Sequence, residues 1–132
     1  MAEHAFRRAL ATRQIDGVEI ASFGLVARDG DVPVEATLRA AAAVGLDLSA
    51  HRARRFDEAR LRPDDTAWVM EHSQRAEVVR RATLRDVLLL GSLVPAAKEE
   101  IADPEEGAED IFDACATRIV ACVNVLAGTM RG

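Results

Sequence analysis

The sequence predicts a doubly wound α/β fold, a three-layer sandwich in which helices cover both faces of a short parallel sheet. Two observations support this prediction. Helical and strand-like patterns alternate along the 132 residues, and the strand-like patterns are short apolar runs, as in sheets buried on both faces. The alternation opens on a helix, whereas the first strand of such folds is usually central and the loop after it often holds the ligand. We therefore expect residues 1–132 to form a single domain from which the first, central strand is missing.

The first half of the chain predicts two helices and one strand. Residues 1–15 read as a helix with no capping residue before it, so its first backbone N–H groups need another partner, such as an anion. A turn leads to a short strand over residues 18–23. After a glycine-punctuated loop, the Ala- and Leu-rich residues 34–44 predict a helix between Pro33 and Gly45.

The second half predicts two strands and two helices. A turn of helix is expected near residues 57–59. Residues 67–70 and 87–90 are compact apolar runs, which predict buried strands, and residues 71–82 between them read as a helix. Apolar residues recur at helical spacing over residues 107–127, which predicts a long closing helix.

The composition excludes several kinds of partner. The net charge of −5, with arginines scattered among acidic residues, argues against nucleic-acid binding, and the basic clusters at residues 52–55 and 80–85 read as solvated faces. No segment is predicted to span a membrane. Two cysteines and no signal-peptide pattern indicate a reducing cytoplasm. His4 and His72 are expected on helix surfaces without partners at metal-ligand spacing, so we expect no metal site.

Several short motifs occur in order along the chain. They are Met1–Phe6, Ser22–Leu25, Gly45–Arg54, Trp68–Glu71, Leu89–Ser92 and Asp103–Pro104, the last followed by Gly107 and Phe112. Together they resemble the low-molecular-weight protein tyrosine phosphatase family over essentially the whole chain. Met1–Phe6 is similar to the helix start that directly follows that family's phosphate loop, Cys-x5-Arg-Ser-Pro. The resemblance implies hydrolysis of phosphomonoesters through a cysteinyl-phosphate intermediate, with no cofactor.

Two residues acquire roles from this resemblance. Asp103 matches the family's Asp-Pro acid, which protonates the leaving oxygen and then accepts a proton from water; taken alone, Asp-Pro is also a common turn. His51 resembles the family histidine that supports the phosphate loop through a hydrogen bond without contacting the substrate. A loop histidine that is hydrogen-bonded to a carbonyl group is an equal alternative. The expected partners are phosphorylated proteins or small phosphomonoesters, and the sequence does not determine the oligomeric state.

The chain departs from the family pattern at its chemical centre. It contains no Cys-x5-Arg, because Ala121 stands six residues after Cys115 and Gly128 stands six residues after Cys122. Both cysteines lie on the apolar face of the closing helix, which predicts buried, inert thiols. We therefore expect the chain as written to be inactive, and we expect the missing strand and phosphate loop to be encoded directly upstream of Met1.

Glu105 and Glu106 follow the Asp-Pro motif, where family members often place aromatic residues. A carboxylate pair at this rim would repel acidic peptides around a phosphotyrosine and attract basic ones. We therefore expect a preference for basic contexts, phosphoarginine included. The alternative is that both side chains point into solvent ahead of the closing helix, whose N-terminal dipole favours acids.

Two other functions compete with hydrolysis. A relative without its phosphate loop could act as a non-catalytic interaction module, but it should compensate for the lost strand with, for example, a polar sheet face. Val69 and residues 87–89 instead keep an apolar pattern typical of a complete core. An arsenate reductase on the same fold needs resolving cysteines near the middle of the chain, and none lies between Met1 and Ala114. The sequence therefore favours the phosphatase.

Overall fold

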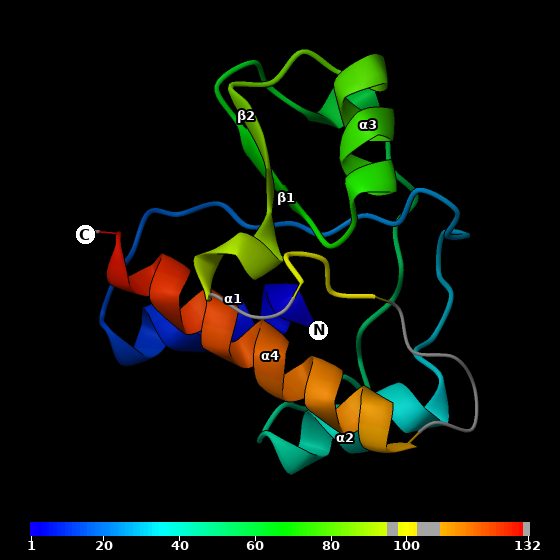
Figure 1. Ribbon diagram of the computed structural model, residues 1–132, viewed down its shortest axis with the longest axis vertical. Coiled ribbons are helices and arrows are strands. Elements are labelled where there is room, and N and C mark those ends of the chain that lie inside the picture. The colour runs from blue at the N-terminus through cyan, green and yellow to red at the C-terminus, as the bar shows by residue number, and fades with distance from the viewer. Residues whose placement is uncertain (95–97, 103–108, 131–132) are drawn as a thin grey trace.

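The computed structural model describes residues 1–94, 98–102 and 109–130. Figure 1 shows the arrangement of the helices and strands in these residues. In chain order they are α1 (Ala2–Thr12), α2 (Glu35–Ala43), the 3₁₀ turn η1 (Glu58–Arg60), β1 (Thr66–Val69), α3 (His72–Arg81), β2 (Asp86–Leu89), the 3₁₀ turn η2 (Leu90–Leu93) and α4 (Glu109–Gly128). The predicted helices and the two later strands are therefore confirmed, with small shifts at their ends.

The two strands form a parallel pair, with α3 as the connection between them. The register runs from Thr66 opposite Asp86 to Val69 opposite Leu89. In β2 the side chain of Leu89 is buried, whereas that of Leu88 is 38% exposed. The prediction that this strand is buried on both faces is therefore wrong, because side chains alternate between faces and only one face of β2 meets the core.

The two faces of β1 pack against different helices. Val69 lies in an apolar cluster with Val78 of α3. Trp68 points to the other face of the strand and packs against a cluster that contains Ala5 of α1 and Ile119 of α4. Figure 1 likewise shows α3 beside the strands and α4 across from it with α1 and α2. The predicted three-layer α/β arrangement is confirmed.

The strand predicted over residues 18–23 is wrong. This segment belongs to no strand in the described part of the chain. Its alternating apolar residues Val18 and Ile20 pack against Leu10 of α1, and Arg7 Nη2 donates a hydrogen bond of 2.5 Å to the Ile20 carbonyl. Packing on helices thus accounts for the alternation, which does not by itself supply the neighbouring backbone that a strand requires.

The expectation about membrane spans also needs correction, because α4 is long and apolar enough by length and composition to cross a membrane. Its apolar side chains, however, have partners in the core. Phe112 packs with Ala40 of α2, and Val123 packs with Ala5 of α1. Burial against these two helices accounts for the apolar side chains on the inner face of α4, whereas Ile111 and Val125 are exposed.

Candidate active site

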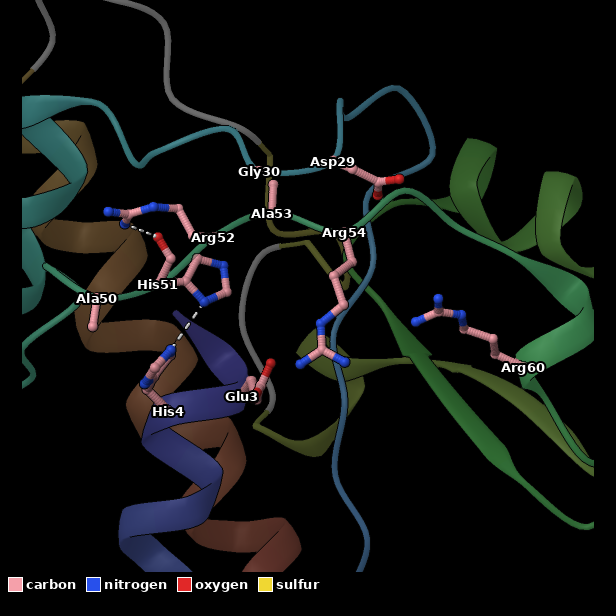
Figure 2. Close-up of a pocket in the computed structure, with 10 residues that line it drawn as sticks. All are labelled: Glu3, His4, Asp29, Gly30, Ala50, His51, Arg52, Ala53, Arg54 and Arg60. Atoms are coloured by element: carbon pink, nitrogen blue, oxygen red, sulfur yellow. Dashed lines mark hydrogen bonds between the residues drawn. The ribbon is translucent and has the colours of Figure 1, made fainter.

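A pocket of about 500 Å³ lies at the N-terminal end of α1 (Figure 2). Its walls are the loop residues 29–30 and 50–54, together with Glu3 and His4 from the first turn of α1 and Arg60 from η1. The N-cap residue of α1 forms no side-chain cap hydrogen bond. The pocket is therefore at the helix end where the sequence predicted a need for another partner.

Backbone hydrogen bonds hold the two loop walls together. The Gly24 N–H donates to the Arg54 carbonyl at 2.8 Å, and the Phe56 N–H donates back to the Gly24 carbonyl at 3.0 Å. Farther along, the Gly30 N–H donates to the Ala53 carbonyl at 2.9 Å. Gly30 has a φ of +89°, a left-handed conformation that glycine adopts without steric cost. These bonds fix the loop that carries the pocket side chains.

His51 projects from this loop toward α1. Its Nδ1 lies 3.0 Å from Nε2 of His4, and the two rings meet edge to face, with centroids 5.0 Å apart. Burial lowers the pKa of His51 below its ordinary value, and the positive charges of the N-terminal amino group and Arg54 lower it further, while Glu3 opposes them. The imidazole of His51 is therefore held in its neutral form more strongly than that of a solvated histidine.

Glu3 is tied to two neighbours. Its carboxylate accepts hydrogen bonds from Ser22 Oγ at 2.6 Å and from Arg7 Nε at 3.1 Å. Burial acts to raise the pKa of Glu3, but these two hydrogen bonds and the charge of Arg7 outweigh it, so the pKa lies below its ordinary value. Glu3 is thus an ionised structural group whose charge is already compensated.

Three arginines line the pocket, against two acidic residues. Arg52 Nη1 donates to the backbone carbonyl of His51 at 2.7 Å, and Arg60 lies 3.6 Å from the carboxylate of Asp57. Within the described ranges, the guanidinium of Arg54 forms no hydrogen bond or ion pair, and Figure 2 shows this side chain extending into the pocket. The excess of guanidinium groups suits an anionic ligand.

The predicted site residues divide into two groups. His51 lines the pocket, whereas Asp103, Glu105 and Glu106 lie outside the described residues. His4 was expected on a helix surface without a partner, and this expectation is wrong, because its ring is half-buried and bonded to His51. Only its place in the first turn of the uncapped helix hinted at this role, since the contact spans 47 positions of the sequence.

The chain immediately before Asp103 is anchored at two points. The Ile101 N–H donates to the Met70 carbonyl, just after β1, at 2.9 Å. Arg118 of α4 donates through Nη1 to the Glu100 carbonyl at 2.6 Å. These bonds hold Glu100 and Ile101 against both the end of β1 and the long helix α4.

Among the residues that the structure describes, no thiol lines the pocket. Cys122 is fully buried, and burial raises the pKa of its thiol, as predicted for an inert cysteine. Cys115 is only partly buried, with its Sγ 4.0 Å from the Ala102 carbonyl oxygen, so the predicted burial is wrong for this residue. The described residues also contain no group of three or more His, Cys, Asp or Glu side chains placed to hold a metal ion.

The comparisons with known proteins point to one family. Residues 1–131 match the family described as low molecular weight phosphotyrosine protein phosphatase. Among the curated proteins there is no sequence match.

Three solved structures illustrate the similarity. The tyrosine phosphatase Wzb of Escherichia coli K30, in complex with sulphate, is 27% identical over 96% of this chain and 85% of that chain, with a TM-score of 0.83. The tyrosine phosphatase AmsI of Erwinia amylovora is 26% identical over 99% of this chain and 83% of that chain, with a TM-score of 0.82. A YwlE mutant from Bacillus subtilis, at 19% identity, shares the fold over 96% of this chain and 86% of that chain, with a TM-score of 0.83. From the family match and this shared fold we conclude that the chain belongs to the low molecular weight phosphotyrosine protein phosphatase family.

Proposed function

We propose that this chain is the scaffold of a phosphomonoester hydrolase that acts through a cysteinyl-phosphate intermediate, and that its 132 residues alone are inactive. One observation carries the proposal: an arginine-lined pocket opens at the N-terminal end of α1 in a chain that matches a phosphatase family over residues 1–131. Helix N-termini and guanidinium groups are both favourable partners of phosphate oxygens. Its substrates would be phosphorylated proteins or small phosphomonoesters.

Asp103 has two tasks in the proposed reaction. A thiolate attacks phosphorus, the bond between phosphorus and the leaving oxygen breaks, and Asp103 gives its proton to that oxygen. The Asp103 carboxylate then takes a proton from the water whose oxygen attacks phosphorus, which releases inorganic phosphate and restores the thiolate. Since no Cys-x5-Arg occurs in the chain, we propose that the nucleophile and its arginine come from a segment encoded upstream of Met1.

The open edge of β1 supports this proposal. In the described residues β1 pairs only with β2, and residues 18–23 join no strand. A further strand beside β1 would give its free backbone groups the partners that buried strands need. The loop after such a strand could then enter the pocket at the start of α1.

The test compares two proteins with an aryl phosphate as substrate: the 132-residue chain and the chain extended by its in-frame upstream codons. We expect the codons to encode an apolar strand and Cys-x5-Arg, and we expect hydrolysis by the extended protein alone. An upstream stop codon or an unrelated coding sequence would refute the proposed source of the nucleophile. An inactive extended protein would favour a non-catalytic interaction module.

In the extended protein, Asp103→Asn should lower kcat by about 10²–10⁴-fold, the usual contribution of general acid–base catalysis, with little change in substrate binding. The loss should shrink for leaving groups that need no proton. Asp110→Asn, on the exposed first turn of α4, is the matched control and should leave turnover unchanged. Equal losses for good and poor leaving groups would assign Asp103 a structural role.

We also propose that Glu105 and Glu106 direct the enzyme toward basic substrates. YwlE, which is named an arginine phosphatase, shares the fold at 19% identity, and a carboxylate pair would attract a cationic neighbour of the phosphoryl group. In the extended protein, Glu105→Gln/Glu106→Gln should lower kcat/KM for basic phosphopeptides relative to acidic ones. The exposed pair Asp110→Asn/Asp113→Asn on α4 controls for net charge. An unchanged ratio of kcat/KM for basic and acidic phosphopeptides would indicate that both glutamates are solvated residues with no role in substrate selection.

A further inference from the structure

The contact between His4 and His51 links the first turn of α1 to the pocket wall. Nε2 of His4 and Nδ1 of His51 are 3.0 Å apart, and the ring planes cross at 77°. Both side chains are partly buried. The geometry is that of a direct hydrogen bond between two imidazoles, as the dashed line in Figure 2 marks.

A bond between two imidazoles needs one N–H and one lone pair. If both facing nitrogens carried protons, the contact would be repulsive, so at least one ring is neutral. A neutral imidazole has its proton on only one nitrogen, so the bond also decides which nitrogen of His51 is protonated. That choice fixes whether the other nitrogen of His51, Nε2, donates or accepts.

The surrounding charges favour one of the two arrangements. Arg54 and the N-terminal amino group exert positive charge on His51, and Glu3 exerts negative charge on it.

Figure 2 shows the free ring nitrogen of His51 turned away from His4, toward the wall that carries Arg54. A lone pair at this position is stabilised by a nearby guanidinium, whereas an N–H is not. Because a neutral imidazole carries only one ring proton, this effect places the shared proton on Nδ1 of His51.

We propose that His4 is a positioning residue: its Nε2 accepts the Nδ1 proton of His51, so that His51 presents an unprotonated Nε2 to the pocket. His51 is then an acceptor for an N–H group of a phosphate loop, a consequence that rests on the proposed function. The tautomer itself does not depend on catalysis, because it follows from contacts within the described residues. Burial, the largest cause of the lowered pKa of His51, favours the unprotonated form of this acceptor.

The test measures the imidazole ¹⁵N shifts of His51 in the 132-residue chain, since these shifts report which ring nitrogen carries the proton. We expect the Nδ1–H tautomer in the parent protein. In His4→Phe, which keeps a ring but removes the acceptor, this tautomer should be lost. In His4→Gln, whose side-chain carbonyl can accept from His51, it should be retained.

His72→Gln is the matched control, because His72 is an exposed histidine of α3 that lies 3.8 Å from Glu100 and does not touch the pair. It should leave the His51 shifts unchanged. Backbone amide spectra verify that each variant folds, and spectra of sedimented protein in the solid state give the same shifts if the chain does not stay in solution. An Nε2–H tautomer in the parent, or an Nδ1–H tautomer that survives in folded His4→Phe, would overturn the proposal.

The outcome is separable from that of the proposed function. If the extended protein is a phosphatase, His4→Phe should shift the acid limb of its kcat/KM profile, whereas His4→Gln should not. If the extended protein is not a phosphatase, the imidazole ¹⁵N shifts of His51 still test whether His4 sets the tautomer of His51. Phosphatase activity with an unaffected tautomer would reject the positioning role alone.

Discussion

Gly91 is the position at which one added methyl group should disturb the structure most. This residue is buried in η2, directly after β2. A Cβ built on it would lie 1.9 Å from the Glu99 carbonyl oxygen and 2.9 Å from Arg118 Nη2. Since real Cβ contacts under 3.0 Å essentially do not occur, Gly91→Ala must displace the backbone around Glu99 by about 1 Å.

The cost of this displacement has two parts. Overpacking a buried site typically costs about 1–3 kcal/mol. The displaced segment also holds the Glu100 carbonyl, which accepts a 2.6 Å hydrogen bond from Arg118, and a bond to a charged group is worth about 1.5–3 kcal/mol. We therefore expect Gly91→Ala to lower the free energy of unfolding by about 2.5–6 kcal/mol, a large share of the stability of a small domain.

Urea unfolding followed by the fluorescence of Trp68, the only tryptophan, measures this change. The matched control is Gly128→Ala at the end of α4, where a Cβ has its nearest contact at 3.6 Å; it should be neutral or stabilising by up to about 1 kcal/mol. Hydrogen exchange at the Ile101 amide, which bonds to Met70, should accelerate in Gly91→Ala alone. Equal stability of the two variants, with Ile101 still protected, would refute the steric argument.

Two further predictions concern stability. Leu48 is 1% exposed in the main core, so Leu48→Ala should lower the free energy of unfolding in urea by about 2–5 kcal/mol. The control Val26→Ala, at a residue 97% exposed, should change this free energy by less than about 0.5 kcal/mol. Similar losses for both variants would contradict the assignment of the core. The lowered pKa of Glu3 stabilises the fold above the ordinary glutamate pKa, and this contribution is lost as the pH falls through the lowered pKa. Ser22→Ala removes a hydrogen bond to the ionised form of Glu3, so it should destabilise the protein at neutral pH and less in acid. A pH-independent loss would show that Ser22 acts by packing.

Local sequence signals were sufficient for much of the fold. The helix expected at residues 34–44 is α2, within one residue at each end, because Pro33 and Gly45 mark both ends. The strand predicted over residues 18–23 is wrong, because the same apolar alternation arises when a segment packs on helices. Only the neighbouring backbone distinguishes the two cases, and that information is not local.

The pocket was predictable only in part. His51 was expected near a phosphate site and lies in the pocket, but its proposed role in the reaction stays a prediction. Arg54 was expected in solvent, and its side chain is exposed while also lining the pocket. His4 could not be predicted, because its partner is 47 residues away and nothing in a single helical turn specifies a contact so distant.

The parallel pairing of β1 and β2 has a consequence for the order in which the chain folds. The pairing of β1 with β2 and the α3 connection between them involve only residues 66–89, so this unit can close its loops at a low entropic cost. α1 instead packs on α4, and Arg13 bonds to the Asn124 carbonyl across 111 positions. During synthesis α1 must therefore remain without its main partner until α4 has left the ribosome. The apolar face of α1, with the buried residues Ala5, Ala9 and Leu10, is thus the surface that a nascent chain exposes longest.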